Sequence, residues 1–110
     1  MVEVGYLPGI VAFKIWNRTN EDIKGLTVSF LDNFKDRKVV VGKIKPNSSK
    51  LLGISVLFMP GDNNLILEKD GYEKAVIKEK VNSDFMGKII INITGFTEDG
   101  KILYTSEFEK

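Results

Sequence analysis

The 110-residue chain contains no cysteine, no histidine and no glutamine, and it has only two alanines. Without cysteine there is no disulfide, no thiolate metal site and no cysteine nucleophile. Without histidine there is no imidazole ligand and no Ser-His or Cys-His catalytic pair. Alanine and glutamine are good helix formers, so their scarcity argues against a helical protein. The length suits one domain, which we expect to span residues 1–110.

β-Branched and turn-forming residues take the place of the missing helix formers. There are twelve Ile, ten Val and five Thr, together with ten Gly and eight Asn. β-Branched side chains pack well on a pleated surface, whereas Gly and Asn suit the backbone of turns. Ile, Val, Leu and Phe make up 38 of the 110 residues, well above the content of a disordered chain. The composition therefore predicts a folded, all-β domain.

Neither a signal peptide nor a membrane-spanning segment is visible in the sequence. Residues 1–9 lack both a basic flank and an apolar run of signal-peptide length. The longest apolar stretch, residues 51–59, is interrupted by Gly53 and Ser55 and has about half the length needed to cross a bilayer. We therefore expect a cytoplasmic location if Met1 is the natural start, and an extracytoplasmic one if the chain is a domain of a longer protein.

Turn signals at short and fairly regular intervals divide the chain into short segments, a pattern typical of a sandwich or barrel. Residues 23–32 show the clearest alternation, with Leu26, Val28 and Phe30 predicted to face the core and the residues between them to face outward. The other expected strands are residues 2–6, 10–17, 38–45, 52–58, 65–69, 72–81, 87–97 and 102–108.

The alternation breaks in residues 38–45, where Val39 and Val41 share one parity and Ile44 has the other. A β-bulge would insert one extra residue and so return Ile44 to the core face. Glycine is common at such positions. The sequence therefore predicts a bulge at Gly42.

Residues 72–81 are compatible with either a strand or a helix. As a strand they place Ala75, Ile77 and Val81 on one face, whereas as a helix they give little apolar pattern. We favour the strand for this reason. In the last strand, parity with Ile102 places two aromatic residues in the core, Tyr104 and Phe108.

Residues 11–50 carry three motifs in a row. The segment of residues 13–19 finishes in Asn17-Arg18-Thr19, and the next strand, residues 23–32, ends in an aromatic residue and an acid. The step Ile44-Lys45-Pro46-Asn47-Ser48-Ser49 then leads into the following strand. This order resembles bacterial immunoglobulin-like β-sandwich modules, including those of the FxLYD type. The resemblance implies an antiparallel immunoglobulin-like β-sandwich, for which the turn spacing predicts eight to nine strands. It also implies a non-catalytic module, often found in surface or envelope proteins, and it supplies no catalytic residues.

The sharpest local feature is a basic run. Within 16 residues the chain has six cations: Lys35, Arg37, Lys38, Lys43, Lys45 and Lys50. Asp36 is the single opposing charge, so six cations minus one acid give a local net charge of +5, against +1 for the whole chain. Such a run suits a surface for nucleic acid, an anionic polymer or an acidic protein. The plainer explanation is edge protection, since lysine on an exposed strand discourages edge-to-edge pairing. With two arginines in the chain and one aromatic in the run, Phe34, nucleic acid is the least favoured partner.

Trp16 is the only tryptophan. It shares parity with Ala12 and Lys14 rather than with Phe13 and Ile15, so it is expected to point away from the core face. Tryptophan is enriched at binding hot spots, which makes Trp16 a candidate partner-binding residue. It would equally serve to cover the end of the sandwich or a neighbouring strand.

Acidic residues recur in the expected turns. These residues are Asp32, Asp36, Asp62, Asp70, Asp84 and Asp99. Loops gathered at one end of a sandwich can supply oxygen ligands for Ca²⁺, but none of these turns has the spacing of an EF-hand loop. Asp and Asn are also ordinary turn formers. No metal ligand, cofactor or catalytic residue is therefore assigned, and no phosphate-binding glycine loop is present.

Taken together, these patterns predict a non-enzymatic structural or protein-interaction module that acts through a strand edge, the end loops or the basic run. Its expected partner is another protein. One alternative is a binding domain for an anionic polymer or Ca²⁺, and a second is a subunit of a symmetric assembly. The sequence does not fix the oligomeric state.

Overall fold

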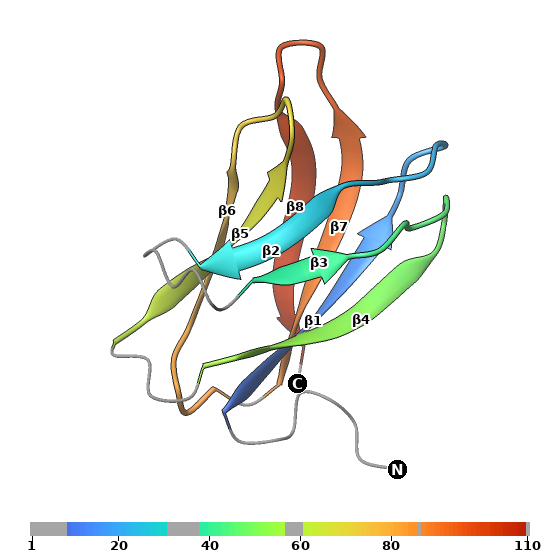
Figure 1. Ribbon diagram of the computed structural model, residues 1–110. Helices are drawn as coiled ribbons and strands as arrows, with labels where there is room; N and C mark the ends of the chain where they lie inside the picture. The colour runs from blue at the N-terminus through green and yellow to red at the C-terminus, as the bar shows by residue number, and fades with distance from the viewer. Residues whose placement is uncertain (1–8, 31–37, 57–60, 86, 110) are drawn as a thin grey trace.

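The computed structural model describes residues 9–30, 38–56, 61–85 and 87–109. All the regular structure in these ranges is β-strand (Figure 1). The strands are β1 (Ile10–Asn17), β2 (Leu26–Phe30), β3 (Val39–Val41), β4 (Ser49–Ser55), β5 (Asn63–Lys69), β6 (Ala75–Val81), β7 (Lys88–Phe96) and β8 (Ile102–Glu109). The predicted strand at residues 2–6 lies outside the described residues.

The eight strands form two four-stranded sheets that pack face to face. We call the sheet with strand order β4-β1-β7-β8 sheet A and the sheet with strand order β3-β2-β5-β6 sheet C. The prediction of an all-β, two-layer sandwich is confirmed. The prediction that every pair is antiparallel is wrong, because β1 and β7 are parallel. These two strands are not joined by a hairpin; the chain passes through the whole of sheet C between them, so their relative direction is not set by a tight turn.

The core lies between the two sheets and follows the predicted alternation. Phe13, Ile15 and Ile91 of sheet A and Leu67 and Ile77 of sheet C are fully buried. Burying a side chain of this size stabilises the fold by about 1.5–3 kcal/mol. Inward-facing residues of both sheets belong to one continuous apolar cluster, so neither sheet has a core of its own.

Strands β2 and β6 match their predicted faces. Leu26, Val28 and Phe30 are buried, as expected, and β6 alternates strictly between buried and exposed residues. A helix cannot place residues of period two on one face, so the helical alternative for residues 72–81 is wrong. Ser29 faces outward but is buried. Its hydroxyl donates a hydrogen bond of 2.7 Å to the carboxylate of Glu68 on the neighbouring strand.

The predicted bulge at Gly42 is wrong. β3 ends at Val41, and Ile44 forms an isolated antiparallel bridge with Ile23. This bridge keeps the register of the Leu26–Val41 pair, because the two paired segments are each displaced by three residues between one pair and the other. The side-chain parity therefore changes on both segments together, and neither segment contains an inserted residue. Register shifts occur instead between Asn64 and Ile66 and between Ile93 and Gly95.

The two aromatic residues predicted to lie in the core of β8 have different environments. Tyr104 is half-buried and packs against the core. Phe108 is 49% exposed, so its assignment to the core is wrong. Its ring packs beside Phe85, with 5.5 Å between the ring centroids. Among the described strands β8 pairs with β7 alone, so its other side leaves the ring accessible to water.

Candidate functional site

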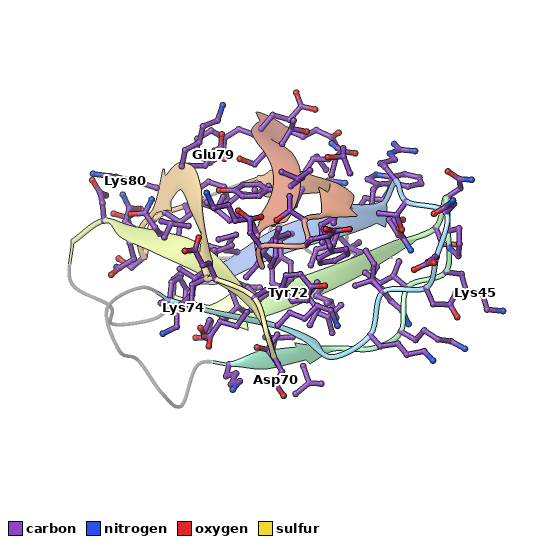
Figure 2. The ribbon with its side chains drawn as sticks, turned by 90° about the horizontal axis from the view of Figure 1, so that it is seen from above. Lys45, Asp70, Tyr72, Lys74, Glu79 and Lys80 are labelled. Atoms are coloured by element: carbon purple, nitrogen blue, oxygen red, sulfur yellow. The ribbon has the colours of Figure 1, made fainter. Side chains whose placement is uncertain are left out.

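The structure disperses the basic run rather than forming one patch. Lys38 precedes β3 and lines a hollow of about 450 Å³ on sheet C, together with Lys69 and Lys74. Lys43 lies in the loop after β3, where its ammonium is 3.9 Å from the carboxylate of Asp22. Lys45 lies at the loop end of the sandwich (Figure 2). The other members, Lys35 and Arg37, lie outside the described residues.

Lys50 is the one lysine of the run that belongs to strand β4. It is paired in register with the fully buried Ile15, so its Cβ points toward the space between the sheets. Its ammonium lies 3.7 Å from the position a Cβ would take at Gly42, the residue that follows β3. The charge of Lys50 therefore sits between the edges of the two sheets.

The backbone of β4 directs half of its polar groups away from β1. The N–H of Val56 donates to the Gly9 carbonyl (2.8 Å), and the N–H of Asn17 donates to the Ser48 carbonyl (2.9 Å). Hydrogen-bonded residues alternate along an antiparallel ladder, so residues 48, 50, 52, 54 and 56 face β1. The N–H and C=O groups of Leu51 and Gly53 point away from it. Among the described strands, β1 is the only one that pairs with β4.

Exposed apolar side chains are confined to the four edge strands. In the described ranges, the large hydrophobic residues with high exposure are Val40 on β3, Leu51 on β4, Val76 on β6, and Leu103 and Phe108 on β8. Leu51 is 45% exposed and lies on the outer face of sheet A, next to Lys14 of β1. Within the described ranges the central strands expose no large hydrophobic residue, so the apolar side chains that these ranges offer to a partner lie along the edges.

The side of the sandwich formed by β6 and β8 is closed by side-chain hydrogen bonds. The Tyr104 hydroxyl donates to the Val76 carbonyl at 2.6 Å, and the Ser106 hydroxyl donates to the Glu79 carboxylate, which is buried. Partial burial raises the pKa of the Tyr104 phenol above 10.0, and the negative charge of Glu79 adds to the rise. These bonds tie β8 to β6 across the gap between the sheets.

Trp16 points away from the core, as its parity predicts, and is partly buried by its own neighbours. The Arg18 guanidinium lies 4.1 Å from the centroid of the Trp16 ring, and the Lys14 ammonium lies 5.0 Å from it. Arg18 also donates a hydrogen bond of 3.1 Å from Nε to Asn92 Oδ1 on β7. Such cation–π contacts stabilise the ring where it is. The ring therefore packs on the outer surface of sheet A, next to Ser49 of β4.

Asn17 holds together the two loops that follow β1 and precede β4. Its amide group is fully buried and donates to the carbonyls of Glu21 (2.7 Å) and Ile44 (2.8 Å). Its Oδ1 accepts hydrogen bonds from the N–H (2.9 Å) and the hydroxyl (2.6 Å) of Thr19. The Asn17 carbonyl accepts the N–H of Asn47, whose φ of 59° is the left-handed conformation that asparagine tolerates. This network sets where β4 begins.

The described residues contain no group of three or more acidic side chains placed to hold a metal ion. Two of the turn aspartates considered as calcium ligands, Asp32 and Asp36, lie outside these residues. None of the described segments forms a helix that could cross a membrane.

Comparisons with known proteins add little. No protein-family model matches the chain, and no curated protein matches it. Among solved structures it is similar to an NMR structure of a protein from Eubacterium rectale, with 14% sequence identity and a TM-score of 0.48. That similarity covers 88% of this chain and 87% of the other chain. No functional argument rests on this likeness.

Two residues that matter at the edges were not singled out from the sequence, although a signal was present for each. Leu51 has the opposite parity to Leu52 and Ile54, which marks it as an apolar residue on the outer face. Glu79 falls on the same parity as Ile77, which marks it as an acid on the inner face. An apolar residue outside and an acid inside are the exceptions that parity can reveal.

Proposed function

We propose that this protein is a non-enzymatic interaction module of the immunoglobulin-like type, and that an extended segment of a partner adds to sheet A beside β4. The Asn17-Arg18-Thr19 motif, in which the buried Asn17 side chain accepts hydrogen bonds from Thr19, supports the immunoglobulin-like assignment. The observation that carries the interaction is the outer edge of β4, where the N–H and C=O groups of Leu51 and Gly53 point away from β1. In strand addition, such backbone groups supply affinity, and side-chain positions on alternate residues supply specificity.

β4 is favoured over the other three edge strands. β3 has three residues, the lower end of the usual strand length, so it offers a partner strand few backbone groups. β6 and β8 are bound to each other through Tyr104 and Ser106, so a strand arriving there meets an edge already bridged by side chains. β4 has seven residues and the exposed Leu51 near its centre. A partner strand could pack one apolar side chain against Leu51 while its backbone pairs with β4.

Peptide selection and amide exchange test this proposal together. Random ten-residue peptides would be displayed on phage and selected against the immobilised protein, and the selected peptides would then be synthesised. We expect them to alternate in apolar residues and to slow hydrogen exchange at the N–H groups of Leu51 and Gly53.

Two variants at one position separate the backbone from the side chain. Leu51→Pro removes an N–H that does not pair with β1, so the variant should fold and lose the peptides. Leu51→Ala keeps the N–H and should retain binding with reduced affinity. The proposal is wrong if the peptides bind Leu51→Pro as tightly as the parent protein, or if they protect amides elsewhere and leave β4 unchanged.

A further inference from the structure

We infer that the segment received beside β4 is acidic, an inference that rests on the proposed function. Residues 42–55, which include the loop after β3 and strand β4, contain three lysines and no acidic residue. Of these three, Lys43 forms an ion pair with a described residue, Asp22. Lys14 adds a further cation on the outer face, beside Leu51. An extended segment lying along β4 therefore meets positive charge on both of its faces.

Lys50 gives this charge a specific position. Its place in the register points it toward the inner side of sheet A, and its ammonium reaches the neighbourhood of Gly42 next to β3. A strand added to β4 would place one of its own inward side chains beside Lys50. The charge of that side chain therefore decides whether Lys50 favours or disfavours the partner.

An inward-pointing lysine on an edge strand discriminates between partner strands. An apolar side chain placed beside Lys50 would remove water from the ammonium without replacing its hydrogen bonds, which is unfavourable. Aspartate or glutamate at that place would form an ion pair instead. Lys50 thus disfavours indiscriminate strand pairing and favours one class of partner, and specificity of this kind combines a repulsive with an attractive element.

The acidic edge of a second copy is the competing occupant, and the structure disfavours it. β8 carries Glu107 and Glu109 and no cation. The Glu109 carboxylate, however, lies 3.4 Å from the ammonium of Lys88 in the same molecule. Tyr104 and Ser106 of the same strand are engaged with β6. An acidic segment of another protein would not have to break this ion pair or these hydrogen bonds in order to bind β4.

The test uses three synthetic ten-residue peptides that share one alternating valine scaffold. Every second residue is glutamate in one, glutamine in the next and lysine in the third. Binding to the full chain would be followed by NMR titration, with the amides of Leu51 and Gly53 as reporters, at low and at physiological ionic strength. The variants are Lys50→Glu and, as matched control, Lys80→Glu on β6, which makes the same charge change far from the loop end marked by Lys45 (Figure 2).

The glutamate peptide should bind the parent protein about 2- to 30-fold more tightly than the lysine peptide, the range expected when a cross-strand pair changes from opposite to like charge. Salt should narrow this difference. Lys50→Glu should reverse the order of the two peptides, and Lys80→Glu should leave it unchanged.

Other outcomes would overturn the inference. If all three peptides shift the β4 amides equally and Lys50→Glu changes nothing, strand addition at β4 stands and the acidic partner is wrong. If no peptide shifts these amides, the proposed function fails as well. Concentration-dependent sedimentation that is lost in Lys50→Glu would identify the occupant as β8 of a second copy. Tighter binding of a single-stranded oligonucleotide at Lys50 would identify it as nucleic acid. Either result would refute an acidic protein segment.

Discussion

Replacing Asn17 with alanine tests how the loop end of the sandwich is built. The substitution removes two hydrogen bonds that the amide donates, to the carbonyls of Glu21 and Ile44, and two that Oδ1 accepts from Thr19. A typical net contribution is about 0.5–1.5 kcal/mol per hydrogen bond, and a buried group left unpaired costs about 1–3 kcal/mol. Water can reach the groups on Thr19 and Glu21, whereas Ile44 is buried.

We therefore expect Asn17→Ala to lower the free energy of unfolding by about 2–4 kcal/mol. For a chain of this length about 1 kcal/mol corresponds to about 4 °C, so the midpoint of thermal unfolding should fall by about 8–16 °C. Urea unfolding followed by the fluorescence of Trp16, which lies next to Asn17, measures the change directly. The midpoint should fall while the slope of the transition stays constant.

A matched control lies in the same loop. Asn20 is exposed, so Asn20→Ala should change the free energy of unfolding by no more than about 0.5 kcal/mol. The reasoning would be refuted if Asn17→Ala and Asn20→Ala were equally stable. It would also be refuted if Asn17→Asp, which keeps the acceptor oxygens but loses both donated bonds and buries a charge, were as stable as the parent protein.

Three further substitutions have defined outcomes. Ser106→Ala deprives the buried Glu79 carboxylate of its hydroxyl donor and should cost about 1–3 kcal/mol in urea unfolding, whereas a loss below about 0.5 kcal/mol would show that water replaces the hydroxyl. Tyr104 has a raised pKa in the folded state, so it binds its proton more tightly there; its contribution is complete below pH 10 and is lost as the pH rises through the folded pKa. Tyr104→Phe should therefore remove part of the fall in stability above pH 10, and an unchanged pH profile would contradict this. Phe13→Ala removes a fully buried ring and should cost about 3–5 kcal/mol by calorimetry, with a small loss meaning that the two sheets close over the space.

The class of fold and most of the strand faces can be predicted from the amino-acid sequence alone. Alternation at period two placed Leu26 and Val28 inside and Trp16 outside, and the structure agrees. Such predictions succeed because a strand sends successive side chains to opposite faces, whatever lies beyond it. The same rule contained the signal for Leu51, an apolar residue with outward parity.

The sequence could not give the arrangement of strands that are far apart in the chain. The parallel pairing of β1 with β7 depends on how two sheets close around one core, and no local pattern encodes it. The error at Gly42 has the same origin, because parity along one strand does not reveal that the partner at Ile23 shifts with it.

The candidate site was likewise decided by tertiary structure. Six cations close together in sequence suggested one patch, yet the four in the described ranges are spread over sheet C, a loop and β4. Whether a lysine on a strand can contact a partner depends on which strands lie at the edge of a sheet and on which of these edges are bridged by side chains. The strand order of sheet A places β4 at one edge, and side-chain hydrogen bonds to β6 bridge the opposite edge, so Lys50 and Leu51 lie on the edge of sheet A that no described strand covers.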